Sequence, residues 1–232
     1  MDDERGRGVF ISVEGIDGSG KSTQVAALAA ALQKAGRRVV KVREPGGTDA
    51  GELIRDVVLH SRFDVALDPW AEALLMVAAR AQLLAEEVRP ALARGDVVVA
   101  DRYVDSTLAY QGGGRGLDIG ALRRLHRDSC GDLWPDLTLL LSLPLDVAAA
   151  RQCAQRLPLD RMEGDAGAGM AHSIAATFAA LADAEPERIT VIDASRTPSE
   201  VSDAVWAAVE RRLHPELPTP DRIPATPPAS GG

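Results

Sequence analysis

Asparagine is absent from this chain of 232 residues, and lysine occurs only at positions 21, 34 and 41. Without asparagine the chain has no N-glycosylation acceptor and no motif that requires this residue. Aromatic residues make up only 3% of the sequence, although hydrophobic residues make up 46%. A folded core must therefore be built mainly from alanine, valine and leucine.

Cysteine is also scarce, because only Cys130 and Cys153 are present and they form no CxxC pattern. This isolation favours two reduced thiols over a metal or redox site. The length suits one α/β domain better than two domains, and it is long enough to bury a substantial core.

The formal net charge of −8 argues against a general nucleic-acid binder, which carries a basic surplus. A small acidic ligand stays possible, because a pocket on an acidic protein can be locally basic. No apolar run reaches the roughly 18 residues of a membrane span, and the charged first ten residues lack the apolar stretch of a secretory signal. We therefore expect neither a nucleic-acid polymer nor a membrane as partner, and a cytoplasmic location.

Short apolar runs alternate with helical patterns along most of the chain. Helices are predicted at 21–35, 49–59, 70–94, 118–129, 145–156 and 198–213, and Pro90 is expected to break the third near its end. Buried strands are predicted at 9–14, 37–44, 96–102, 137–143 and 188–194. Strands that alternate with helices pair in parallel through right-handed crossovers. The sequence thus predicts an α/β protein with a doubly wound, five-stranded parallel sheet covered by helices on both faces.

The predicted domain spans residues 9–213, after a short N-terminal tail at 1–8. From position 214 to 232 the chain is rich in proline and lacks apolar periodicity. Such a composition predicts a disordered tail.

The segment GIDGSGKS at 15–22 places three glycines and one of the rare lysines between a predicted strand and a predicted helix. It fits the pattern GxxxxGK[ST], in which glycines let backbone N–H groups turn toward an anion at the helix N-terminus. Lys21 supplies a charge for the terminal phosphates, and Ser22 an oxygen for Mg²⁺. The alternative is a glycine-rich turn without a ligand. The predicted nucleoside triphosphate cradle consists of Gly15, Ile16, Asp17, Gly18, Ser19, Gly20, Lys21, Ser22 and Thr23.

This cradle does not by itself distinguish kinases from GTPases, motor ATPases or nucleotide sensors. Guanine recognition in GTPases uses a motif with asparagine, which this chain lacks. The predicted strand VVVAD ends in Asp101 and Arg102, at the edge where such sheets bind ligands. A carboxylate there suits Mg²⁺ through water and an arginine suits a phosphate, although a surface ion pair is the alternative.

Four blocks of the sequence occur in an order that resembles one known family. They are EGIDGSGKST (14–23), REPGGT (43–48), DRYVDSTLAYQGGGRG (101–116) and PDLTLLL (135–141). Through these blocks, residues 9–213 resemble bacterial thymidylate kinase, a P-loop nucleoside monophosphate kinase. The resemblance implies phosphorylation of dTMP to dTDP with ATP and Mg²⁺, for dTTP synthesis, in a homodimer.

The resemblance also implies a role for each matching catalytic residue. Asp17 would accept a hydrogen bond from the 3′-hydroxyl of the acceptor nucleotide. Arg102 would clamp the transferring phosphoryl group together with Lys21, and Asp101 and Ser22 would hold Mg²⁺.

For the acceptor nucleotide, the resemblance places Arg80 at the edge of the base, although a surface arginine is the alternative at that position. Tyr110 would lie near the sugar and disfavour a 2′-hydroxyl. The remaining residues implied to contact the acceptor are Arg43, Tyr103, Ser106, Thr107 and Gln111.

Two departures from the family pattern bear on rate and specificity. The family carries an aromatic residue that stacks on thymine three or four positions before Arg80, where this chain has Met76 and Val77. A predicted lid at about 151–173 keeps Arg156 and Arg161 as catalytic arginines, and its segment GDAGAG (164–169) is predicted to be mobile rather than a helix start. Two alternatives stay open: a kinase for a modified or different deoxynucleoside monophosphate, and a catalytically weak nucleotide-binding homologue.

Overall fold

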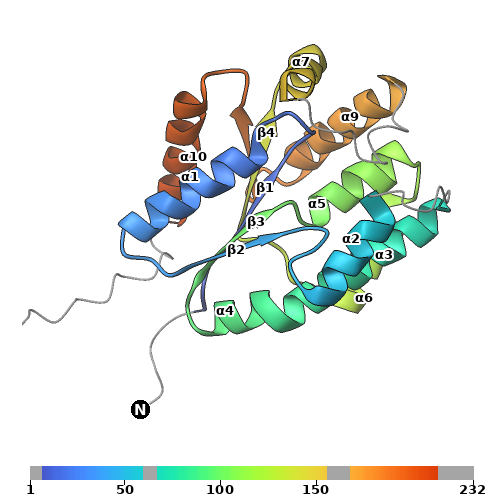
Figure 1. The fold of residues 1–232 in the computed structure, drawn as a ribbon, viewed down its shortest axis with the longest axis horizontal. Helices are drawn as coiled ribbons and strands as arrows, with labels where there is room; N and C mark the ends of the chain where they lie inside the picture. The colour runs from blue at the N-terminus through green and yellow to red at the C-terminus, as the bar shows by residue number, and fades with distance from the viewer. Residues whose placement is uncertain (1–6, 60–66, 156–167, 214–232) are drawn as a thin grey trace, which may run out of the picture.

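The computed structural model describes residues 7–59, 67–155 and 168–213 (Figure 1). Its centre is one sheet of parallel strands in the order β2-β3-β1-β4-β5. The strands are β1 (Phe10–Glu14), β2 (Val39–Arg43), β3 (Val97–Asp101), β4 (Leu137–Ser142) and β5 (Ile189–Asp193). The predicted doubly wound sheet is confirmed, and each predicted strand is trimmed by a residue or two at its ends.

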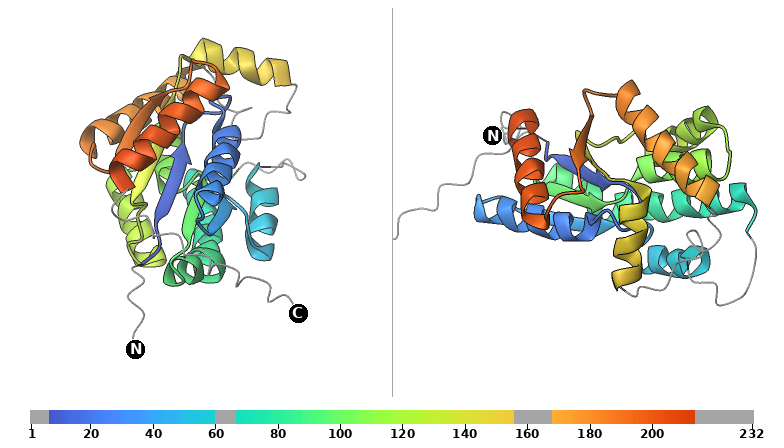
Figure 2. Two further views of the ribbon diagram at one scale, coloured as in Figure 1. Left: turned by 90° about the vertical axis from the view of Figure 1, so that its left-hand side faces the viewer. Right: turned by 90° about the horizontal axis from the view of Figure 1, so that it is seen from above.

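Helices cover both faces of this sheet (Figures 1 and 2). One face is covered by α1 (Lys21–Lys34) and α10 (Pro198–Leu213). The helical segments on the other face are α2 (Asp49–Leu59), α3 (Pro69–Leu83), η1 (Leu84–Val88), α4 (Arg89–Ala93), α5 (Val104–Thr107), η2 (Leu108–Gly114), α6 (Ile119–Cys130) and α9 (Ala168–Ala184). A further helix, α7 (Leu145–Gln155), follows β4.

Two separate apolar clusters result from the alternation of side chains along each strand. Phe10 belongs to the cluster under α3 and α9, whereas Ile11 belongs to the cluster under α1 and α10. Both side chains are fully buried, and each such burial stabilises the fold by about 1.5–3 kcal/mol. A strand buried on both faces has no polar alternation, which explains the continuous apolar runs in the sequence.

The expected break of the third helix at Pro90 is wrong. The chain remains helical from Pro69 to Ala93, but residues 84–88 form a π turn in which Arg89 donates its backbone N–H to the carbonyl of Leu84. A wider turn removes the clash between the proline ring and the preceding carbonyls. The proline thus changes the pitch of the helix rather than ending it.

The expectation for the glycine-rich segment at 164–169 is wrong at its end, because Ala168 and Gly169 begin α9. Residues 164–167 lie outside the described residues. Met170, Ile174 and Phe178 recur at helical spacing and pack into the apolar cluster, and Phe178 meets the ring of Tyr110 with centroids 6.4 Å apart. This packing against η2 holds the start of the helix despite its small residues.

The predicted tails at 1–8 and 214–232 lie largely outside the described residues, as does most of the predicted lid. None of the helices in the described ranges is long and apolar enough to cross a membrane.

His126 gives the fold a testable pH dependence. Burial lowers its pKa to about 4, and the nearby charge of Arg80 adds to this effect. Its Nε2 lies 3.1 Å from the carbonyl of Leu133, whereas its Nδ1 is buried without a hydrogen-bond partner among the described residues. A proton on Nδ1 would be a buried donor without an acceptor, so the neutral ring is the form that the fold holds. Because the unfolded chain binds the proton more readily, stability is lost as the pH falls from about 6.5 toward 4. We expect wild type to lose about 2 kcal/mol relative to His126→Gln between pH 7 and pH 4.5.

Denaturant titrations at the two pH values measure this difference. His172→Gln, at an exposed position on α9, is the control and should follow wild type. A constant difference between wild type and His126→Gln across this range would contradict the assignment.

Candidate active site

The loop between β1 and α1 has the geometry of an anion cradle. Gly15 has φ 141°, and a Cβ at this position would lie 2.5 Å from the carbonyl oxygen of Leu141. Gly20 precedes α1 with φ 91° and no side-chain cap, and a Cβ there would point into open space. The first N–H groups of α1 lack partners within the helix and carry the positive end of its dipole. A phosphate fits this position.

Lys21 is held inside this cradle. Its side chain is only 6% exposed, and its Nζ donates to the carbonyl of Ile16 at 2.9 Å and to Oδ1 of Asp17 at 3.2 Å. Burial lowers the pKa of Lys21, as does Arg102, whereas Asp17 and Asp101 raise it. The ammonium group is therefore fixed in place and little hydrated.

Ser22 and Asp101 meet at the start of α1 and the end of β3. The hydroxyl of Ser22 donates to Oδ2 of Asp101 at 2.7 Å, and both residues line an open cleft of about 510 Å³ that also includes Arg43. Hydroxyl and carboxylate oxygens are ligands that suit Mg²⁺. Among the described residues no group of three carboxylate, histidine or cysteine side chains could hold a metal alone, so a cation here would keep water or phosphate ligands.

Arg102 is the centre of a hydrogen-bond network around the loop. Its Nη1 donates to the carbonyl of Gly15 at 3.1 Å and to Oγ of Ser106 at 3.0 Å. Its Nη2 donates to Asp17 and, at 3.1 Å, to the hydroxyl of Tyr110. That hydroxyl donates in turn to Oδ2 of Asp17 at 3.1 Å. The structure thus gathers four predicted site residues, Gly15, Asp17, Ser106 and Tyr110, around one guanidinium group.

Glu14, which the sequence analysis did not select, holds the backbone beneath this network. Arg102 has φ 70°, a conformation that costs a non-glycine residue about 1–2 kcal/mol. Glu14 stabilises the turn by accepting the backbone N–H of Tyr103 at 2.7 Å and the hydroxyl of Ser106 at 2.6 Å. Burial raises the pKa of Glu14 to about 8, and the charge of Asp105 adds to the rise.

Arg80 is buried in an ion pair. Its side chain has no exposed surface, and it contacts the carboxylate of Glu44 at 2.7 Å. Its Nη2 also donates to Oγ1 of Thr107 at 2.8 Å, and its guanidinium carbon lies 5.0 Å from the ring centroid of Tyr103. Burial opposes its charge, but Glu44 raises its pKa further. The alternative of a surface arginine is therefore wrong.

A second buried polar group spans α3 and η2 next to this pair. Gln111 donates its Nε2 to Oε1 of Glu72 at 2.9 Å, and Glu72 also pairs with Arg115 at 3.2 Å. Two atoms here are buried without a hydrogen-bond partner among the described residues: Nη1 of Arg80 and Oε1 of Gln111. One is a donor and the other an acceptor, so the two atoms could pair with a ligand that offers one acceptor and one donor.

A model of the thymidylate kinase family matches residues 13–205. The chain belongs to the thymidylate kinase family. The family resemblance predicted from the four sequence blocks is confirmed.

Individual members of the family are similar along most of their length. The thymidylate kinase of Thermomicrobium roseum is 50% identical over 200 residues, which cover 86% of this chain and 93% of that protein. The thymidylate kinase of Deinococcus radiodurans is 45% identical over 208 residues, which cover 90% and 99%. The crystal structure of thymidylate kinase from Ehrlichia chaffeensis matches with a TM-score of 0.71 and 28% identity, covering 88% of this chain and 99% of the other.

The geometry of α3 distinguishes Met76 from Val77, the two candidates for the position of the family's stacking aromatic. Glu72, Met76 and Arg80 are spaced by four residues, so all three share one face of α3. Val77 is rotated away from Glu72 by more than a quarter turn, and both Met76 and Val77 are buried in the apolar cluster. Of the two predicted candidates, Met76 is therefore the one that shares a helix face with both Glu72 and Arg80, and its contact with the base stays a prediction.

Two predicted substrate residues are engaged elsewhere in this structure. Tyr103 is buried and donates its hydroxyl to the carbonyl of Leu133 at 2.9 Å, which favours a supporting role beneath Arg80. Arg43 pairs with Glu52 at 2.8 Å at an exposed position. Their contact with the acceptor stays a prediction.

The two lid arginines, Arg156 and Arg161, lie outside the described residues, so their role also stays a prediction. At the near edge of the lid, Arg151 donates its Nη1 to the carbonyl of Ala194 at 2.9 Å. This contact ties α7 to the loop that follows β5.

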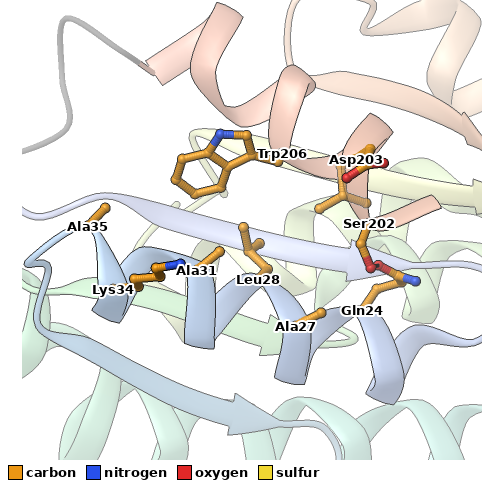
Figure 3. A pocket seen from close by; sticks show the side chains of 10 residues that line it. Gln24, Ala27, Leu28, Ala31, Lys34, Ala35, Ser202, Asp203 and Trp206 are labelled. Atoms are coloured by element: carbon orange, nitrogen blue, oxygen red, sulfur yellow. Dashed lines mark hydrogen bonds between the residues drawn. The ribbon is translucent and has the colours of Figure 1, made fainter. Parts of the chain in front are cut away.

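A separate cavity of about 430 Å³ lies between α1 and α10 (Figure 3). Ala27, Leu28 and Ala31 face Trp206 across it, and one end is closed where Ser202 donates to Oε1 of Gln24 at 2.9 Å. None of the predicted site residues lines this cavity. The candidate active site is therefore the region around the loop and α3, not this groove.

Proposed function

We propose that this chain transfers the γ-phosphoryl group of ATP to dTMP and forms dTDP. The observation that carries the proposal is the buried donor and acceptor that lack partners, Nη1 of Arg80 and Oε1 of Gln111, beside a complete phosphate cradle. Membership of the thymidylate kinase family supports it, and none of the comparisons favours a different substrate.

The base edge of thymine complements these two atoms. Its O4 accepts a hydrogen bond and its N3–H donates one, which matches the guanidinium of Arg80 and the amide oxygen of Gln111. Cytosine presents an amino donor and an N3 acceptor at the corresponding positions, so both contacts would become repulsive. Unpaired buried polar groups are costly, and a site of this kind rejects the wrong base strongly.

The remaining residues position the two phosphates and balance their charge. Lys21 holds the terminal phosphates of ATP, and Arg102 lies between the donor loop and the acceptor. When bound, Mg²⁺ neutralises charge on the donor phosphates, and Ser22 and Asp101 are the residues that would hold it. There is little covalent work for side chains in such a reaction, so alignment and charge are the main contributions.

Asp17 and Tyr110 define the sugar side of the site in this proposal. The carboxylate of Asp17 accepts the 3′-hydroxyl, and the ring of Tyr110 fills the space where a 2′-hydroxyl would lie. The hydrogen bond between them keeps both groups in one orientation.

A coupled assay of ADP release tests the proposal with dTMP, dUMP, dCMP and 5-hydroxymethyl-dUMP as acceptors. We expect dTMP to give the highest kcat/KM, dUMP to be lower by about tenfold or more for its missing methyl group, and dCMP to fall below a hundredth of dTMP. ATP turnover that no monophosphate stimulates would contradict the kinase assignment. A preference for 5-hydroxymethyl-dUMP would favour the modified-substrate alternative.

Met76 offers a prediction about the base. Stacking on an aromatic contributes about 1–3 kcal/mol, and a methionine sulfur recovers about 0.3–1.5 kcal/mol of such a contact. We expect Met76→Phe to lower the KM for dTMP several-fold and to impair bulkier 5-substituted acceptors. Val77→Phe, on the neighbouring face of α3, is the control and should not lower this KM. An equal effect of both substitutions, or of neither, would remove Met76 from the base contact.

We also propose a homodimer in the cytoplasm. Most of the exposed large apolar side chains lie on α2 and α3, where Leu53 is 71% exposed and Leu74 is 52% exposed. An apolar patch of this kind fits a surface that a second copy covers. We expect sedimentation to give the mass of two chains for wild type and of one chain for Leu53→Asp with Leu74→Asp, whereas wild type sedimenting as a single chain at micromolar concentration would contradict the dimer.

A further inference from the structure

The side-chain amide of Gln111 can take two orientations, and each orientation suits a different kind of base. One presents the oxygen, which accepts the N3–H of thymine or uracil, and the other presents the amino group, which would instead suit the N3 of cytosine. The side chain is fully buried in η2, so water cannot select between the orientations. Neighbouring side chains must do so.

Glu72 supplies this selection, because a carboxylate only accepts hydrogen bonds. Its Oε1 lies 2.9 Å from the Nε2 of Gln111, and an amide turned the other way would place two oxygens against each other. The carboxylate is only 1% exposed. The contact therefore turns the amino group of Gln111 toward α3 and leaves the oxygen as the unpartnered atom.

Arg115 holds the carboxylate of Glu72 in place by donating to both of its oxygens. Its Nε and Nη2 lie 3.3 Å and 3.2 Å from the two carboxylate oxygens. A guanidinium group only donates hydrogen bonds and never loses its charge under ordinary conditions. It therefore pairs with both oxygens of Glu72, and the amino group of Gln111 donates to the same carboxylate. Both Arg115 and Gln111 thus donate to Glu72, and the amide oxygen of Gln111 is left facing away from this carboxylate.

We infer that Glu72 and Arg115 are positioning residues that orient the amide of Gln111 and so select an acceptor base whose N3 carries a hydrogen. This inference rests on the proposed function, since it takes Gln111 to face the base. Neither residue is required to touch the substrate. Their effect on specificity passes entirely through the amide of Gln111.

A double-mutant cycle tests this coupling. We measure kcat and KM for dTMP, dCMP and ATP in wild type, Glu72→Gln, Gln111→Ala and the double variant. Glutamine at position 72 keeps the shape but can donate or accept, so the amide of Gln111 loses its fixed orientation. We expect Glu72→Gln to raise the KM for dTMP about tenfold and to narrow the preference for dTMP over dCMP, without a change in the KM for ATP.

The cycle separates positioning from general support of the fold. If Glu72 acts through Gln111, the double variant is no worse than Gln111→Ala alone. If the fold-changes of the two single variants multiply in the double variant, the inference is overturned. Equal rises in the KM for ATP and for dTMP would overturn it as well. Absence of dTMP turnover in wild type would overturn the proposed function and the inference with it, whereas a normal wild type with multiplying effects overturns the inference alone.

The chain offers a matched control. Glu86 accepts a hydrogen bond from Gln82 at an exposed position of the same helical run, so Glu86→Gln makes the same chemical change away from the site and should leave all constants unchanged. Melting temperatures show which variants fold. If Glu72→Gln does not fold, Glu72→Asp, whose carboxylate is one methylene shorter and withdraws from Gln111, enters the same cycle with the same expected outcomes.

Discussion

Replacing Lys21 by alanine is expected to lower kcat for phosphoryl transfer by roughly a hundred- to a thousandfold. The ammonium group is buried at the start of α1, where it donates to the carbonyl of Ile16 and to the carboxylate of Asp17. In the proposed function, the terminal phosphates of ATP are its partner. Because burial disfavours the charge and lowers the pKa of Lys21, its removal should shift the melting temperature by only a few degrees.

Lys34 provides the comparison for this substitution, since it lies exposed in the last turn of the same helix. Lys34→Ala should keep the wild-type kcat. A Lys21→Ala enzyme with nearly normal kcat, or one that has lost its cooperative melting transition, would show that Lys21 does not act on the phosphates.

Replacing Arg102 by lysine should lower kcat by about a hundredfold and change the KM for dTMP less than threefold. The guanidinium group makes hydrogen bonds in four directions, to Gly15, Ser106, Asp17 and Tyr110. A lysine carries one compact charge and cannot keep this planar arrangement. A clamp between two phosphates contributes most where charge is shared between them, so the loss belongs to the transition state.

Steady-state kinetics with both substrates measure the separation between kcat and KM. Arg124→Lys, at an exposed site on α6, makes the same exchange far from the loop and should match wild type. If Arg102→Lys changes KM alone, the residue binds the ground state and is not a clamp in the transition state.

The order of strands and helices and the phosphate cradle were accessible to sequence reasoning because both depend on local patterns. Apolar runs without alternation require burial on both faces, and β1 and β3 confirm this. Gly15 and Gly20 adopt the positive φ values that a loop around an anion needs. The prediction of a helix break at Pro90 was wrong because the spacing of apolar residues does not reveal a π turn, which here accommodates the proline.

The proposed base site depends on contacts between distant parts of the chain. Arg80 meets Glu44 across 36 positions, Gln111 meets Glu72 across 39, and Ser106 meets Glu14 across 92. Glu14 and Glu44 lie at strand ends within the sequence blocks EGIDGSGKST and REPGGT, so the sequence could have indicated that they are near the site. Apart from their charge, Glu72 and Arg115 had no feature in the sequence that indicated this. Sequence periodicity states which face of α3 is buried, but it does not state what that face meets.

The sequence by itself therefore determined the fold, the donor cradle and the family of this protein, because glycine spacing and apolar periodicity are properties of neighbouring residues. Only the tertiary structure showed that Nη1 of Arg80 and Oε1 of Gln111 are buried without a hydrogen-bond partner among the described residues. It also decided that Arg80 is a buried donor rather than a surface charge. The physical reason is that burial and hydrogen-bond direction depend on which elements pack together, and α3 meets η2 only when the sheet has brought them side by side.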